Sequence, residues 1–350
     1  MTDIRSMTEE ELEKELAAMG EKKFRAAQIF EWLHRHRAES FEQMSSLPAA
    51  LRGRLAESFS LVTLRPVRIL TSQTDGTKKF LFELPDGNVI ESVWMRYRHG
   101  NSVCISSQVG CRMGCRFCAS TLDGLVRGLT ASEMLEQVYR IGSLTGERVD
   151  SIVVMGSGEP LDNYDALVRF IRLATNPKGQ DISNRGITVS TCGLVPEIYR
   201  LADEGLGITL ALSLHASDDE TRRRLMPIAR KYDLAEVLAA CKAYFHKTGR
   251  RISYEYSLVH GVNDTRKEAQ ALGRLLSGQN CHVNLIPVNP IKERDFTRSG
   301  REQIEAFQKT LEGCGINATI RREMGRDIDG ACGQLRRSYL KKEAEERKTL

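Results

Sequence analysis

From Ser102 onward the chain alternates short apolar runs with amphipathic stretches, and this alternation restricts the fold more than any other feature. Between the runs, apolar residues recur every three or four positions, which is typical of helices. Parallel strands require crossover helices, so a repeated strand–helix order predicts a parallel sheet covered by helices. We expect an α/β fold in which six β/α units curl into a full or partial barrel. The expected strands lie within residues 102–107, 151–157, 186–192, 207–215, 251–259 and 282–289.

The residues before this repeat divide into two further parts. Thr8 and Glu11 form a capping box, and Pro48 suits the first turn of a later helix, so the N-terminal part reads as helical. Alternating apolar residues around Asp86 and Gly87 predict a β-hairpin. We therefore expect a helical domain over 1–60, a hairpin extension over 61–100, a core over 101–335 with a further strand within 316–323, and a charged tail over 336–350 whose last ten residues are frayed.

Composition and charge exclude several classes of protein. Nine cysteines are an odd number and, outside one cluster, are scattered, which argues against a disulfide scaffold and favours a reducing cytoplasm. Residues 1–20 are charged and lack the apolar stretch of a secretory signal, and no apolar run is long enough to cross a bilayer, so no membrane partner is expected. The net charge of +5 is compatible with a nucleic-acid partner without requiring one.

Three of the cysteines, Cys111, Cys115 and Cys118, stand in a C-x3-C-x2-C pattern directly after the first expected strand. A structural zinc site needs a fourth Cys or His nearby, and none follows closely. A thioredoxin-like motif would use Cys115 and Cys118 and leave Cys111 unexplained. Three thiolates can instead hold three irons of a 4Fe–4S cube and leave one iron open to a ligand with amino and carboxylate groups. Zinc and buried thiols remain the alternatives.

Polar groups recur at the ends of the later expected strands. Gly156 and Gly158 allow a ligand to approach the backbone closely, and Glu159 adds a carboxylate beside them. Barrel folds assemble their sites at the carboxyl ends of strands, so these positions predict a ligand wall. By itself His215 would read as a core histidine with its hydrogen bonds satisfied. The candidate binding residues are Gly158, Glu159, Ser190, Ser213, Leu214, His215 and Asn289.

Two more cysteines lie outside the cluster pattern and look reactive. Small residues flank Cys332 in a glycine-rich segment, where a thiol is accessible. Cys104 lies on the first expected strand, seven residues before the cluster pattern. Two thiols near a cluster that needs neither as a ligand suggest covalent catalysis.

These motifs together resemble the RlmN family of radical S-adenosylmethionine (SAM) methyltransferases. The resemblance rests on the three cluster cysteines, "MGSGEP", "STCG", "SLH", "NLIPVN" and "DIDGACGQL", and it runs from the N-terminal unit to Leu335. It implies a radical SAM partial (β/α)6 barrel, one 4Fe–4S cluster, SAM, and methylation of carbon 2 of adenosine. The implied substrates are 23S rRNA at the peptidyl transferase centre and tRNA next to the anticodon. Ser157 and Cys192 depart from the family, where methionine and serine are common.

The resemblance also implies a mechanism that uses two SAM molecules per turnover. Cys332 would take a methyl group from the first, and a radical made from the second would activate that methyl group for addition to carbon 2. Glu91 would accept the carbon-2 proton, and Cys104 would attack sulfur to release the product and leave a Cys104–Cys332 disulfide. From the residues alone, Glu91 reads as a surface glutamate of the hairpin.

Basic residues on the N-terminal helices suggest where RNA docks, although a solvated helix surface explains the charge equally well. An electron donor such as flavodoxin or ferredoxin is also implied. A related family, Cfr, modifies carbon 8 of adenosine and is the alternative within the class, and a zinc-dependent RNA-binding module without catalysis is the alternative outside it. The basic residues are Lys22, Lys23, Arg25, His34, Arg35, His36 and Arg37.

Overall fold

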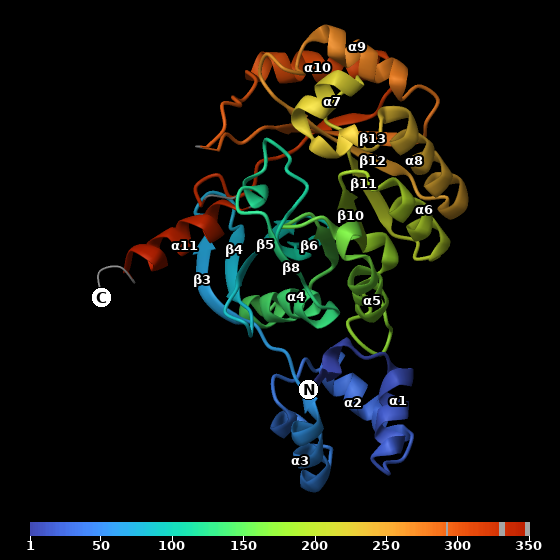
Figure 1. Ribbon diagram of the computed structural model, residues 1–350, viewed down its shortest axis with the longest axis vertical. Helices are drawn as coiled ribbons and strands as arrows, with labels where there is room; N and C mark the ends of the chain where they lie inside the picture. The colour runs from blue at the N-terminus through green and yellow to red at the C-terminus, as the bar shows by residue number, and fades with distance from the viewer. Residues whose placement is uncertain (292, 329–332, 347–350) are drawn as a thin grey trace.

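The computed structural model describes residues 1–291, 293–328 and 333–346, with side chains described up to residue 341. Its centre is a ten-stranded sheet in the order β14-β13-β12-β11-β10-β9-β6-β5-β4-β3, which Figure 1 shows running from β3 at the left to β13 near the top. Seven strands are parallel, and they confirm the predicted strands: β6 (Gly100–Cys104), β9 (Ser151–Val154), β10 (Ile187–Thr191), β11 (Thr209–Ser213), β12 (Ile252–Leu258), β13 (Cys281–Pro287) and β14 (Ala318–Ile320).

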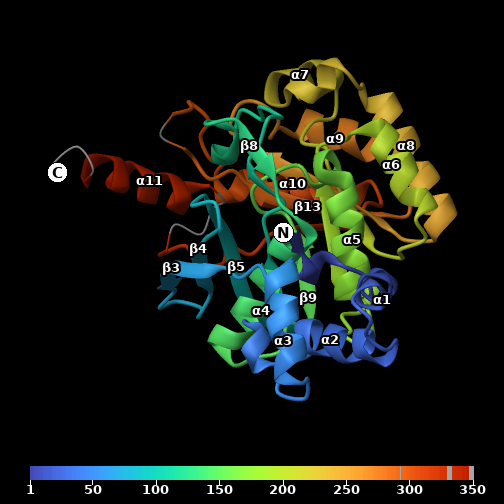
Figure 2. The ribbon, with the colours of Figure 1, turned by 60° about the horizontal axis from the view of Figure 1, so that its bottom comes forward.

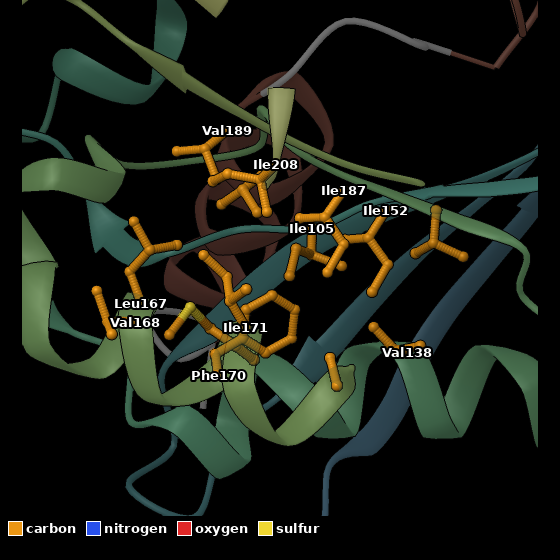
Figure 3. Packing of buried hydrophobic residues seen from close by; sticks show 14 of the residues in the cluster. Ile105, Val138, Ile152, Leu167, Val168, Phe170, Ile171, Ile187, Val189 and Ile208 are labelled. Carbon is orange, nitrogen blue, oxygen red and sulfur yellow. The ribbon is translucent and has the colours of Figure 1, made fainter. Parts of the chain in front are cut away.

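Helices cover the outer face of this curled parallel sheet. Between α4 and α5 and the strands they face, apolar side chains such as Val138, Phe170 and Ile152 interdigitate to form the main core (Figure 3). Thr130 and Glu133 cap α4 as a capping box. The covering helices are α4 (Ala131–Thr145), α5 (Tyr164–Ala174), α6 (Val195–Asp203), α7 (Asp219–Leu225), α8 (Leu234–Thr248), α9 (Arg266–Leu275) and α10 (Arg301–Gly313).

An antiparallel extension continues the same sheet beyond β6. It consists of β3 (Arg65–Thr71), β4 (Lys78–Glu83) and β5 (Val89–Tyr97), and β5 pairs antiparallel with β6. A separate short hairpin of β7 (Gln108–Gly110) and β8 (Leu125–Gly128) leaves the barrel after β6. The extension therefore shares a continuous hydrogen-bond ladder with the barrel.

The C-terminal segment differs from expectation. Residues 334–346 form helix α11 (Gln334–Glu346), where we expected a charged tail from residue 336 with fraying from residue 341. Leu335 is buried against Leu81 and Val89 of the extension, and Tyr339 and Leu340 pack beside it. Tyr339 and Leu340 follow Leu335 by four and five residues, so the three side chains lie on one side of α11 and can be buried together, although most residues of the helix are charged. The rest of α11 extends away from the body (Figure 2).

The N-terminal helices α1 (Glu9–Ala18), α2 (Phe24–His34) and α3 (Ala49–Ser58) dock below the barrel, at the bottom of Figure 1. A fully buried ion pair joins Arg5 to Glu136 of α4. His34 is also fully buried, and its Nδ1 lies 2.9 Å from the Tyr139 hydroxyl. Burial lowers the pKa of His34 to about 3, so this ring is neutral. His34 therefore does not belong to an RNA-docking face, which corrects the expectation.

Among the described residues, no helix combines the length and the apolar character needed to cross a bilayer.

Candidate active site

A cavity of about 660 Å³ opens at the carboxyl ends of the parallel strands. Loops from successive strands meet at this end of a barrel, so residues distant in sequence converge here. The segment after β7 lines one side, and the segments after β13 and β14 line the other. Ten residues singled out from the sequence line the cavity: Cys104, Cys111, Cys115, Cys118, Gly158, Glu159, Ser190, Ser213, His215 and Asn289.

Two predicted residues lie behind the cavity wall, and a third is outside the described residues. Leu214 is fully buried in the core, and its backbone N–H donates to the Glu255 carbonyl at 3.0 Å. Glu91 is buried on β5 and accepts a hydrogen bond from the backbone of Gly333. The next residue, Gln334, lines the cavity. Cys332 falls within 329–332, which the structure does not describe.

The loop that carries the three cluster cysteines is fixed at both ends. Gly110 has a positive φ of 76°, and a Cβ there would come 2.0 Å from the Gly124 carbonyl, so only glycine fits. The Cys111 N–H donates to that same carbonyl at 2.9 Å. Farther along, the Arg116 N–H donates to the Leu225 carbonyl of α7 at 2.9 Å. The loop is thus anchored to β8 on one side and to α7 on the other.

The chemistry of the three thiols suits an iron–sulfur cluster. Burial raises the pKa of Cys111 to about 12 and that of Cys115 well above its usual value. Such thiols stay neutral until a metal displaces their protons, which is how a coordinating thiol becomes a thiolate. Among the described residues, no three His, Cys, Asp or Glu side chains converge as they would around one metal ion. A four-iron cube spreads its ligands over separate irons, so the three cysteines fit that group without such convergence.

The wall after β9 is built around a buried carboxylate. Glu159 Oε2 accepts the Cys192 N–H at 2.8 Å, and Oε1 accepts the Leu161 N–H at 3.0 Å. Burial raises the pKa of Glu159, because the two backbone hydrogen bonds do not fully replace the water lost by the charged carboxylate. A cationic group such as an amino group would stabilise the charged form. Gly158 has φ 110°, and a Cβ there would lie 2.6 Å from the Gln108 Cβ. Glycine is therefore required here for the wall to pack against Gln108.

His215 also lines the cavity, and its ring is held in the neutral form. Its Nδ1 accepts the Ser257 N–H at 2.9 Å, which leaves the proton on Nε2. The ring meets Phe117 of the cluster loop edge to face, with centroids 4.8 Å apart. Burial lowers the pKa of His215 to about 3, so it contributes shape and an N–H donor rather than positive charge.

Glu91 is not a surface residue, in contrast to its reading from the hairpin pattern. Its side chain is buried and pairs with Lys79, whose Nζ lies 3.1 Å from Oε2. It also accepts the backbone N–H groups of Gly333, at 2.8 Å, and of Arg336. Cys104 stands two residues along the same sheet face, since Val93 pairs with Cys104. The structure thus brings Glu91 to the segment directly after Cys332.

Sequence reasoning missed several residues that shape the site. Arg222 on α7 is fully buried and donates to the backbone carbonyls of Cys192 at 2.8 Å and Leu214 at 3.3 Å. Glu255 lines the cavity and accepts from the Asn284 amide at 2.7 Å. A charge inside an otherwise apolar strand was the available signal for Glu255. Arg222 gave none, because three arginines in a row on a short helix look like a solvated face.

Comparisons with known proteins agree with this geometry. Residues 105–272 match the radical SAM superfamily. Residues 2–61 match the ribosomal RNA large subunit methyltransferase N-terminal domain. A crystal structure of a radical SAM methyltransferase from Sphaerobacter thermophilus is similar with a TM-score of 0.91 and 45% identity, over 95% of this chain and 99% of the other.

Whole-chain relatives have the same character. A protein of Lachnospira eligens, named probable dual-specificity RNA methyltransferase RlmN, is 60% identical over 340 residues, which is 97% of either chain. A protein of the same name from Geobacillus kaustophilus is 54% identical over 346 residues, covering 98% of this chain and 94% of its own length. The chain belongs to the RlmN family of radical SAM RNA methyltransferases.

Proposed function

We propose that this protein methylates carbon 2 of adenosine in 23S rRNA and in tRNA, through a methyl group carried on Cys332. One observation carries the proposal. Cys104 lines the same cavity as the three cluster cysteines, and the segment directly after Cys332 reaches that cavity at Gln334 while bonding to Glu91. Relatives named dual-specificity RNA methyltransferases support both RNA substrates.

Each residue then has a defined task. Cys111, Cys115 and Cys118 hold the 4Fe–4S cluster, and Glu159 holds the amino group of SAM. When bound, the cluster and SAM supply methyl groups and a radical that removes hydrogen from carbon. Cys332 presents the methyl carbon on its sulfur, and Glu91 accepts the proton from carbon 2. The Cys104 thiolate then forms a bond to the Cys332 sulfur as the bond from that sulfur to the transferred carbon breaks. The electron pair of the broken bond leaves with that carbon, which takes up a proton to complete the methyl group.

The partners follow from this chemistry. An adenine must leave its stack to reach a cavity at the end of a barrel, so the substrate is a remodelled segment of RNA. The exposed Lys22 and Lys23 and the half-buried Arg25 of the N-terminal unit supply phosphate contacts. A small reducing protein such as flavodoxin or ferredoxin supplies electrons. The cytoplasm is the proposed location of the reaction, because ribosomal RNA is found there and nine scattered cysteines suit a reducing compartment.

The test is nucleoside analysis of rRNA and tRNA from cells that lack the protein and are complemented with variants. The wild-type chain restores 2-methyladenosine in both RNAs. Cys332→Ala restores none, although the purified protein stays brown, because Cys332 is not a cluster ligand. The control Cys314→Ala changes an exposed cysteine far from the cavity and behaves as the wild type.

Three results would contradict the proposal. Restored 8-methyladenosine would favour the carbon-8 reaction. A colourless protein with zinc and no iron after anaerobic purification would favour an RNA-binding module. Normal 2-methyladenosine from Cys332→Ala would remove the methyl-carrying thiol from the mechanism.

A further inference from the structure

Lys79 is a buried cation on the same sheet face as Glu91 and Cys104. In the pairing of β4 with β5, Leu81 stands opposite Glu91 and Lys79 stands opposite Val93. Val93 in turn stands opposite Cys104 in the pairing of β5 with β6. Lys79, Val93 and Cys104 therefore form one row across three strands. Side chains two residues apart on a strand point to the same face, so Glu91 lies on the same face as this row, next to Val93.

Helix α11 covers the outer part of this face. Leu335 packs on Leu81 and Val89, which flank the pair of Lys79 and Glu91. The Lys79 side chain is fully buried, and that of Glu91 is nearly so, with Nζ 3.1 Å from Oε2. Removing both charges from water is costly and often yields little net stability, so a buried ion pair calls for an explanation besides stability.

The other two donors to Glu91 come from the segment after Cys332. They are the backbone N–H groups of Gly333 and Arg336. Both donors therefore belong to one segment, and in the proposed reaction the thiol just before that segment becomes bonded to RNA. Lys79 lies on β4, which is paired on both sides, with β3 and with β5, so its position is set by the sheet and not by that segment.

We propose that Lys79 is a positioning residue for proton removal from carbon 2. Its ammonium group, with Nζ 3.1 Å from Oε2, holds the Glu91 carboxylate on the Cys104 face through a contact that does not come from the segment after Cys332. The inference rests on the function proposed above. In the step it serves, the carbon-2 C–H bond breaks, an O–H bond forms on Glu91, and the electron pair of the broken bond stays in the purine ring. Lys79 keeps its own protons and acts through Glu91 alone.

The experiment follows the covalent protein–RNA adduct in a single turnover. Anaerobic holoenzyme is mixed with an RNA fragment that contains the target adenosine, and denaturing gels follow how the adduct forms and disappears. A positioned base contributes about 10²- to 10⁴-fold to a rate, and its misplacement loses part of that. We expect Lys79→Met to form the adduct at the wild-type rate and to release product roughly 10- to 100-fold more slowly.

The matched control is Lys78→Met. Lys78 is the adjacent lysine on β4 but points to the opposite face, where it stands opposite Trp94. It should release the adduct at the wild-type rate. A purely structural role for Lys79 would lower the melting temperature or the iron content without making the adduct persist.

A double variant shows whether Lys79 acts through Glu91. Because the two residues serve one step, Lys79→Met added to Glu91→Gln should slow release no further than Glu91→Gln alone. Lys79→Arg, which keeps the charge, should release the adduct faster than Lys79→Met. If Lys79→Met does not fold, Lys79→Gln takes its place, because it keeps an N–H donor and loses the charge.

Release of the adduct at the wild-type rate by either uncharged variant would overturn the inference, as would additive effects in the double variant. Failure of the proposed function looks different. In that case the wild-type enzyme itself would form no adduct through Cys332.

Discussion

Breaking the buried ion pair between Arg5 and Glu136 should weaken the attachment of the N-terminal helices to the barrel. Arg5 also donates to the carbonyls of Ala38 and Val62, and Glu136 accepts the Leu64 N–H at 3.1 Å, so the pair connects three segments. In Glu136→Gln, the guanidinium remains buried without its counter-charge. Removing one partner of a buried pair costs about 3–5 kcal/mol.

That cost converts into a measurable shift of the melting temperature. An unfolding entropy of about 2.1 cal/mol/K per residue, over 350 residues, makes each kcal/mol worth about 1.4 °C. Glu136→Gln should therefore melt about 4–7 °C below the wild type in differential scanning calorimetry. The matched control is Lys178→Met, which removes the exposed Lys178–Glu9 pair across the same boundary. Exposed pairs contribute about 0–1 kcal/mol, so the control should move by about 1 °C or less.

The outcome that would refute this reasoning is a Glu136→Gln protein that melts within about 1 °C of the wild type. It would mean that the guanidinium reaches water or another acceptor once the carboxylate is gone. A second transition at low temperature, with the barrel transition unchanged, would instead show that the N-terminal unit melts separately.

The remaining predictions concern pH, metal and RNA. Since burial lowers the pKa of His34 to about 3, against about 6.5 when unfolded, its contribution to stability is complete above pH 6.5 and is lost as the pH falls from there toward 3. The melting temperature of the wild type should therefore fall more than that of His34→Gln between pH 7.5 and pH 5. Cys115→Ala should lose most of its iron and its brown colour, measured by metal analysis and absorbance, and full retention of iron would contradict its role as a ligand. Replacing Lys22, Lys23 and Arg25 one at a time by Gln should each lower the slope of log affinity against log salt by about 0.7–0.9 in RNA-binding titrations, and an unchanged slope would remove that residue from the docking face.

The fold was predictable where the pattern is local. Strands such as Ile187–Thr191 alternate buried β-branched residues with partly exposed hydroxyl residues, and this signal needs no distant partner. Helix α10 has a weaker signal, because only Ile304, Phe307 and Leu311 are buried in it, a narrow stripe among charged residues. Helix α11 was missed for a related reason, since its few apolar residues have meaning only against β4 and β5.

The site was predictable to the extent that its residues stand at strand ends. Ser190 and Asn289 follow from strand position alone, because the carboxyl ends of parallel strands converge. Glu91 came only from the family resemblance, since its burial depends on α11 lying across the extension. Lys79 and Arg222 depend on strand register and on contacts between elements far apart in sequence, which periodicity does not report.

The ladder from β4 through β5 to β6 has a consequence for how this enzyme can be re-engineered. Backbone pairing, rather than loop conformation, sets the spacing between Lys79, Glu91 and Cys104. Residues 65–97 should therefore be exchangeable as a unit. A chimera that receives this segment from a relative would carry the relative's residues at positions 79 and 91, and strand pairing would place them in register with Cys104 of this chain.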